Sequence, residues 1–317
     1  MKFPYEEFSF DEVRTYPLDS RQSKAQRKDF ASPFTRGSGV TGLVDSLPNI
    51  LAGNDFRRVV DALARARAED AGIVWGIGAH VVKTGLSPVV IDLMERGFVS
   101  AIATNGAGMI HDFEVALAGA TSEDVDEALG PGRFGMAEET GTLLNQAINE
   151  GVDAGQGIGQ AVGKFLHDRA PHHMEASIFA AAHRLDIPVT VHVAVGTDII
   201  HMHPAASGAA LGAGSLRDFR YFVSSVARLE RGVYLNCGSA VLLPEVFLKA
   251  VALARNRGVS LGELTTVNLD FLRHYRPETN VVKRPTAGTA RGISLVGHHE
   301  LLIPLLAAAL VERISEA

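Results

Sequence analysis

Short apolar runs alternate with longer amphipathic stretches along most of the chain. Each apolar run ends at glycine or at a small polar residue, as a strand buried in a parallel sheet would. Between the runs, apolar residues recur at helical spacing over about 10–15 residues. The pattern predicts six strands, over residues 72–78, 99–104, 187–193, 232–236, 263–269 and 293–296.

The stretches between these strands predict helices. They span residues 56–63, 87–96, 112–118, 140–148, 158–167, 174–185, 216–229, 244–256 and 301–314. Strands that alternate with helices of this length form a parallel sheet with helices on both faces. We therefore predict an α/β fold with a doubly wound, mostly parallel, Rossmann-like sheet.

Two segments depart from this alternation. Residues 1–43 are polar and of mixed charge, and we predict an N-terminal arm. The arm is either a loose tail or a segment that reaches a neighbouring subunit. Residues 119–171 are rich in Gly, Glu and Asp, and we predict a helical insertion that covers or lines a cleft. The remainder of residues 44–317 is predicted to form a single nucleotide-binding domain.

Composition and charge narrow the class of protein. Of the 317 residues 46% are hydrophobic, which is enough for a buried core. The net charge is −6 and no long Lys/Arg cluster occurs, which disfavours nucleic-acid binding. The N-terminus lacks the basic and apolar regions of a signal peptide, and the longest apolar windows contain charged residues. We therefore expect a cytoplasmic protein that does not bind membranes.

Small or polar turns follow four of the predicted strands, at residues 76–80, 104–108, 196–198 and 236–239. In doubly wound sheets, ligands bind beyond the carboxyl ends of the strands, and glycine there lets the backbone approach a ligand. These turns predict a nucleotide-sized crevice. The first turn has Gly76 and Gly78, but Val81 stands where a dinucleotide fingerprint has its third glycine. Any dinucleotide would therefore bind in another geometry.

Other side chains suggest chemistry less strongly. Two histidine clusters, one at residues 192–203 and one at 298–299, could hold a metal or could hydrogen-bond within a polar cleft. We favour the second interpretation and assign no metal. Cys237 rules out an internal disulfide because it is the only cysteine, and it is either an exposed nucleophile or, more commonly, a small core residue. Lys83 follows the first turn and is either a surface lysine or a group that binds an acid.

The order of these turns resembles the deoxyhypusine synthase family over residues 47–308. Residues 103–112 are similar to the turn on which that family binds NAD, and residues 236–239 stand where it has three glycines. The resemblance implies a doubly wound fold, a dimer or homotetramer with shared sites, and NAD as cofactor. The residues that it implies for NAD binding are Gly78, His80, Thr104, Asn105, Gly106, Gly108, Asp198 and Gly238.

The chain departs from the family at its catalytic residues. The family's catalytic lysine lies in a Trp-Gly-Lys motif, whereas residues 284–292 here contain neither Trp nor Lys. The segment that is acidic in the family, where it binds a polyamine, here carries Arg276, Lys283 and Arg284. These cations would repel a polyamine. We therefore exclude deoxyhypusine synthesis.

The sequence predicts an NAD-dependent enzyme that acts on a small anionic substrate. Lys83, Arg276, Lys283 and Arg284 would bind the substrate, and Asp198 would bind ribose or orient a histidine. Ornithine cyclodeamination, which the wider superfamily includes, would suit such a substrate. The acid/base residues would be His111, His201 and His298, provided that they converge on one point. The alternatives are a non-catalytic nucleotide sensor or scaffold, and a metal-dependent hydrolase.

Overall fold

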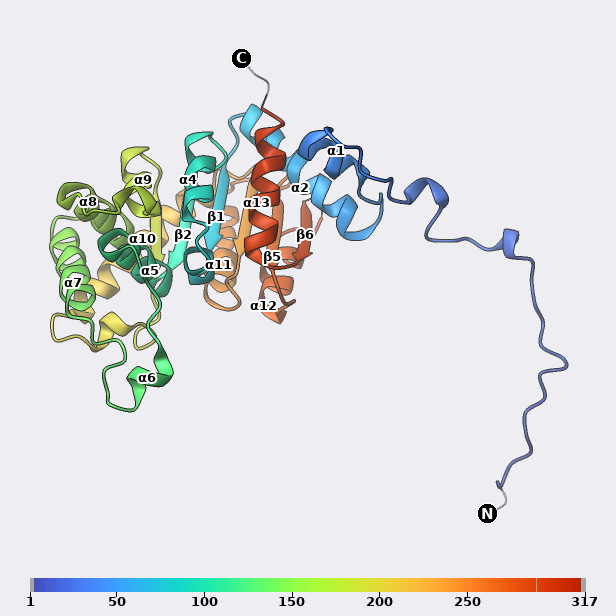
Figure 1. Cartoon of the computed structure of the whole chain (residues 1–317), viewed down its shortest axis with the longest axis horizontal. Helices are drawn as coiled ribbons and strands as arrows, with labels where there is room; N and C mark the ends of the chain where they lie inside the picture. Colours follow the sequence, from blue (N-terminus) through green and yellow to red (C-terminus); the bar gives the residue numbers. More distant parts are fainter. Residues whose placement is uncertain (1–2, 289, 315–317) are drawn as a thin grey trace.

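A single six-stranded sheet forms the centre of the computed structural model, which describes residues 3–288 and 290–314. All neighbouring strands are parallel, in the order β3-β2-β1-β4-β5-β6 (Figure 1). The strands are β1 (Ile73–Ile77), β2 (Ala101–Asn105), β3 (Val189–His192), β4 (Val233–Cys237), β5 (Thr265–Asp270) and β6 (Arg291–Val296). This sheet confirms the predicted fold class, and its strand order reverses direction between β1 and β4.

Helices cover both faces of the sheet (Figure 1). One face packs on α2 (Leu51–Ala68), α4 (Ser87–Glu95), α5 (Gly106–Ala118), α9 (Ile178–Arg184) and α13 (His299–Val311). The other face packs on α10 (Gly208–Val226) and α11 (Leu242–Asn256). The remaining helices are α1 (Gly39–Ser46), α3 (Ala79–Lys83), α6 (Val125–Leu129), α7 (Glu138–Asp153), α8 (Ile158–Arg169) and α12 (Tyr275–Pro277). No helix in the described part of the chain has the length and apolarity needed to cross a membrane.

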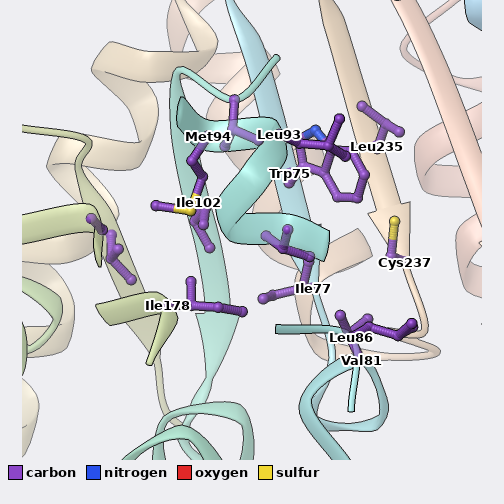
Figure 2. Close-up of a cluster of buried hydrophobic side chains, with 14 of the residues drawn as sticks. Trp75, Ile77, Val81, Leu86, Leu93, Met94, Ile102, Ile178, Leu235 and Cys237 are labelled. Carbon is purple, nitrogen blue, oxygen red and sulfur yellow. The ribbon is translucent and has the colours of Figure 1, made fainter. Parts of the chain in front are cut away.

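The central strands are apolar because helices bury them on both sides. All five residues of β1 are buried. Trp75 lies on the α4 side, where Figure 2 shows its ring beside Leu93, and its indole N–H donates to the Phe98 carbonyl at 3.1 Å. On the opposite face, the Tyr234 ring stacks on Phe247 with centroids 3.7 Å apart. The core therefore has two halves, separated by the sheet.

Three helices begin at least five residues earlier than their sequence patterns predict. The predicted helix at residues 112–118 starts at Gly106, because the Asn105 side chain accepts a hydrogen bond from the Gly108 amide and caps the helix. Gly106 and Gly108, which the sequence pattern assigns to a turn, thus belong to the first helical turn of α5. Similarly, α2 begins at Leu51 instead of residue 56, and α10 begins at Gly208 instead of residue 216.

The N-terminal arm extends away from the rest of the chain (Figure 1). Residues 3–38 contain no α-helix or strand, and almost all of them are exposed. The first α-helix, α1, is anchored by the carboxylate of Glu312, which accepts hydrogen bonds from the Val40 and Thr41 amides at 2.9 and 2.6 Å. Residues 119–171 contain α6, α7 and α8, and α8 packs against α9 and β3.

Arg57 ties the loop between α1 and α2 to the start of α2. Its guanidinium donates to the Val44 and Leu47 carbonyls at 2.7 and 3.1 Å, and to the Pro48 carbonyl at 2.7 Å.

Arg57→Ala should lower the free energy of unfolding by about 2–3 kcal/mol, because it leaves part-buried carbonyls without donors. Urea denaturation measures this loss. Arg220→Ala is the matched control, since this side chain is exposed on α10, and it should change stability by less than about 0.5 kcal/mol. Equal effects of the two variants would contradict this role for Arg57.

Candidate active site

The turns after β1 and β4 touch each other at the point where the strand order reverses. The Gly78 amide donates to the Cys237 carbonyl at 2.8 Å. A Cβ atom on Gly78 would lie 2.3 Å from the Gly238 carbonyl oxygen, so only glycine allows this approach. Gly238 itself has a φ of +70°, in the left-handed region. The carboxyl ends of β1 and β4 therefore present backbone without side chains at the switch point.

The turn after β2 is held by its own side chains. The Thr104 hydroxyl donates to the Ile77 carbonyl at 2.9 Å, and the Asn105 side chain accepts from the Gly108 amide at 2.9 Å. A Cβ atom on Gly108 would lie 2.2 Å from the Thr104 hydroxyl oxygen. Thr104, Asn105 and Gly108 therefore shape the turn and already have partners within the protein.

Asp198 reaches this turn from the loop that follows β3. A Cβ atom on Gly106 would lie 2.1 Å from Oδ2 of Asp198, so the carboxylate lies against the first residue of α5. The positive end of a helix dipole favours a negative charge there. Burial raises the pKa of Asp198, and the nearby His201 opposes that shift. The structure thus brings together two predicted binding residues, Gly106 and Asp198, that are distant in sequence.

His201 is fixed in one neutral form by backbone amides. Its Nδ1 accepts hydrogen bonds from the Gly196 and Asp198 amides at 3.1 and 3.3 Å, so Nε2 carries the proton. Protonation of Nδ1 would displace both amides. These contacts fix the orientation of the His201 ring, and its acid/base role stays a prediction. Its Nε2 lies 3.8 Å from Oδ2 of Asp198, and both atoms are buried without a hydrogen-bond partner in the described part of the chain.

His111 has the opposite tautomer. The Thr121 hydroxyl donates to the Glu114 carboxylate, so its oxygen accepts from Nδ1 of His111, 2.7 Å away. Nε2 of His111 therefore has a free lone pair. Burial and the charge of Lys83 lower the pKa of His111, while Glu114 raises it. Thr140 on α7 also donates to Glu114, at 3.0 Å. These contacts orient His111 as a proton acceptor beside Lys83.

His80 and His298 lie in a second group, at the carboxyl ends of β1, β5 and β6. The His298 ring is parallel to that of Phe271 with centroids 6.2 Å apart, and the His80 ring lies 6.1 Å from the same phenyl ring. The buried His299 lies 5.5 Å from His80. This group is aromatic and partly exposed, so it offers a stacking surface for a planar ligand.

The three predicted acid/base histidines lie on three separate segments of the chain. His111 belongs to the helix after β2, and His298 follows β6. Four strand intervals separate β2 from β6, or about 19 Å at about 4.8 Å per interval. No hydrogen bond or ring contact joins His111, His201 and His298 in the described part of the chain, and their convergence on one point stays a prediction.

The predicted anion-binding arginines surround a carboxylate of the protein itself. Nε of Arg276 lies 3.4 Å from Oε1 of Glu245. Asn280 donates to the same oxygen at 2.8 Å and accepts from Arg284 at 2.8 Å. Lys249, Arg276 and Arg284 hold the pKa of Glu245 below its usual value. Lys283 is exposed, as is Lys83. Glu245 thus lies among the predicted anion-binding arginines, and substrate binding by Lys83, Arg276, Lys283 and Arg284 stays a prediction.

His192 and Cys237, two other residues of reactive type, are buried in the core. Burial lowers the pKa of His192 to about 4, and its ring packs on Phe222. Cys237 is fully buried, and burial raises the pKa of its thiol, as expected of a core residue.

No group of three His, Cys, Asp or Glu side chains that could hold a metal occurs among residues 3–288 and 290–314. A cavity of about 330 Å³ between α8, α9 and α10 contains none of the predicted site residues.

The sequence interpretation missed Glu114 and Thr121. Glu114 stands three residues after His111 on one helix face, and this spacing could have identified the pair. Thr121 lies in the loop after α5, and its contact with His111 depends on the path of that loop. His299, next to the predicted His298, was recognised only as part of a histidine cluster.

Comparisons with known proteins support the fold. No family model and no curated protein matches the chain. A conserved candidate LOR/SDH protein from Methanococcus maripaludis S2 is similar in structure, with a TM-score of 0.54, 18% identity, and coverage of 83% of this chain and 70% of that one. AgrE in complex with ornithine and NAD⁺ has a TM-score of 0.56, 15% identity, and coverage of 83% and 34%.

A candidate deoxyhypusine synthase from Entamoeba histolytica is also similar, with a TM-score of 0.53, 12% identity, and coverage of 89% of this chain and 96% of that one. The chain spans only about a third of the AgrE chain. At these identities the likeness concerns the fold alone. The chain thus has the deoxyhypusine-synthase-like, Rossmann-like fold that the sequence resemblance implies.

Proposed function

We propose that this chain is an NAD-dependent enzyme whose cofactor lies across the carboxyl ends of β2, β1 and β4. The observation that carries the proposal is the reversal of strand order between β1 and β4, where Gly78 and Gly238 bring two turns into contact. Doubly wound sheets bind dinucleotides at such a switch point. AgrE, which has a similar fold, has been solved with NAD⁺ and ornithine.

The buried polar atoms at the end of β2 fit one ribose of NAD. Oδ2 of Asp198 can accept from a ribose hydroxyl, and Nε2 of His201 can donate to one. The absent side chain of Gly106 leaves room for the Asp198 carboxylate at this position. Residues 103–112 resemble the turn on which the deoxyhypusine synthase family binds NAD, but Asp198 would repel the phosphates of NAD from the first turn of α5, which lies there. We place the diphosphate over the turns of Gly78 and Gly238 instead.

His111 is the proton acceptor in this proposal. NAD, when bound, would supply the hydride acceptor for the reaction. Thr121 and Glu114 keep Nδ1 of His111 protonated, which leaves Nε2 free to take a proton from a substrate hydroxyl or amine. Lys83, the predicted cation that lies near His111, would pair with a carboxylate of the small substrate.

A second candidate function is a nucleotide-binding module without catalysis. The separation of His111 from His298 favours it, because a binding module needs no converging acid/base groups. The two candidates differ in the role of His111. In an enzyme this residue takes part in turnover, whereas in a module its loss changes nothing but local contacts.

Substitution of His111 separates the two candidates. His111→Gln should leave NAD affinity within about threefold and lower turnover by about 10²–10⁴, the usual contribution of a general base. Release of ammonia and formation of NADH, followed in parallel with small amino acids and L-ornithine first, measure turnover, and calorimetry measures affinity. Lys164→Gln, an exposed change on α8, is the control and should alter neither quantity. NAD binding without turnover on any such substrate would favour the non-catalytic module.

A further inference from the structure

The edge of the sheet at β6 is open. The Arg291 amide donates to the Leu264 carbonyl at 2.9 Å, and the Gly297 amide donates to Asp270 at 3.0 Å, so odd-numbered residues of β6 face β5. The N–H and C=O groups of a strand residue point to the same side, and those of Gly292, Ser294 and Val296 therefore point outward. Among the residues that the structure describes, these groups have no backbone partner.

The opposite edge, at β3, is closed by side chains. Asp218 on α10 accepts from the Val191 amide at 2.8 Å, and the Ser215 hydroxyl donates to the Val191 carbonyl at 3.1 Å. The same Asp218 oxygen accepts from the Gly159 amide on α8 at 3.0 Å. Proteins commonly cover sheet edges in such ways, because an uncovered edge pairs with other chains. The contrast makes β6 the edge available for pairing.

Arginines gather along the open edge. Two adjoining hollows of about 460 and 310 Å³ lie between α2 and β6, and both are lined by Arg58 and Arg291. Arg65 lines the second hollow, and its Nε is buried with no hydrogen-bond partner among the described residues. The carboxylates nearby are Asp55, 3.5 Å from Arg58, and Asp61, which pairs with Arg313 at 3.2 Å. This basic groove therefore has more positive than negative charge and suits an acidic ligand.

The N-terminal arm has the complementary chemistry. Residues 3–13 include four acids and no Lys or Arg. Phe8 and Phe10 are each 79% exposed. In an extended strand, Glu7 and Asp11 share one face, while Phe8 and Phe10 share the other. Residues 3–25 form hydrogen bonds only with one another in the described chain, so the folded body of the same copy does not hold them.

We propose that residues 5–12 of one copy of this chain add as an extra strand to β6 of a second copy. Glu7 and Asp11 then lie on the basic groove of Arg58, Arg65 and Arg291. Phe8 and Phe10 cover the other face, where Val296 is 49% exposed. Backbone pairing supplies affinity, and the alternating side chains supply specificity, as in other strand additions.

The length of the arm permits this exchange. The backbone first joins the body at Asp29, whose carbonyl accepts from the Asn49 amide at 2.9 Å. The segment between Glu12 and Asp29 can extend over roughly 55 Å. That reach exceeds the width of the sheet and allows two copies to exchange arms reciprocally, which doubles the contact in a symmetric dimer.

Sedimentation velocity of the full chain tests the proposal, because it measures how reversing the charges of the arm and of the groove changes assembly. The wild type should form a dimer or tetramer at micromolar concentration. Glu7→Arg with Asp11→Arg should weaken assembly at least about 30-fold, and so should Arg58→Glu with Arg291→Glu. Combining all four changes should restore assembly. Arg220→Glu, an exposed change on α10, is the control and should have no effect.

Two further measurements keep the outcome decisive. Phe8→Ser with Phe10→Ser should also dissociate the assembly, and these exposed arm positions leave the folded body intact, as circular dichroism would verify. A monomeric wild type, an arm bound to its own body, or unchanged assembly of the arm variants would overturn the proposal. The proposal would also be overturned if the groove binds inorganic phosphate and neither the arm variants nor the groove variants change the assembly.

Discussion

Valine in place of Gly106 should abolish NAD binding, with a loss of at least about 100-fold in affinity. A Cβ atom at this position would lie 2.1 Å from Oδ2 of Asp198 and 2.6 Å from its Cγ. The larger valine side chain must therefore displace the carboxylate and fill the space proposed for the ribose. Calorimetric titration with NAD measures the loss.

The control for this variant is another glycine in a helix. Gly212→Val on α10 places its side chain where no heavy atom lies within 4 Å, so it should leave NAD affinity unchanged. Both variants should show the wild-type circular dichroism spectrum. Full NAD affinity in folded Gly106→Val would show that the cofactor does not use the end of β2.

Removal of the Asp198 carboxylate should weaken NAD binding by about 10–150-fold, or about 1.5–3 kcal/mol. Asp198→Ala deletes the buried acceptor for the ribose hydroxyl. Asp198→Asn keeps the size and one acceptor oxygen, so its loss should be smaller. Calorimetry on the two variants separates the charge from the shape of the side chain. Equal affinity of wild type and Asp198→Ala would remove Asp198 from the cofactor site.

The same carboxylate makes binding depend on pH in a defined direction. Burial raises the pKa of Asp198 above its usual 3.8, so protonation begins at a higher pH than for an exposed aspartate. A protonated carboxyl group is a weaker acceptor, and NAD affinity should therefore fall as the pH decreases toward this raised pKa. Titrations at several pH values should show this fall in the wild type and not in Asp198→Asn.

The strands were predictable because burial on both faces leaves a continuous apolar signal. All of β1 is buried, for example, and the run Ile73–Ile77 contains no charged residue. Helix starts were less predictable where a cap decides them. The side chain of Asn105 starts α5 within a glycine-rich segment that reads as a turn. Local patterns thus specify the elements more reliably than their ends.

The site was predictable in part, and the limit is spatial order. Placing turns at the carboxyl ends of parallel strands needs only the sequence. It identified three glycines where a side chain would clash: Gly78 lies against the Gly238 backbone, Gly106 against the Asp198 carboxylate, and Gly238 against the His299 ring. The strand order, however, depends on crossovers whose direction no local pattern records. That order separates His111 from His298.

The partners of charged side chains were also not predictable, because they too depend on how the elements pack. Arg276 and Arg284 follow one another closely in sequence, and both lie near Glu245, which belongs to α11. Glu245 could be identified as their partner only from the packing of α11 against the segment after β5. Hydrogen bonds likewise decided the tautomers of His111 and His201, since the residue type alone does not say which nitrogen carries the proton.

Titration of the wild-type chain with NAD by isothermal calorimetry at neutral pH tests the central claim most directly. The proposal predicts saturable binding of one NAD per chain, with a dissociation constant on the order of 10–100 µM. The absence of any binding heat up to about 5 mM NAD, confirmed at a second temperature, would contradict it.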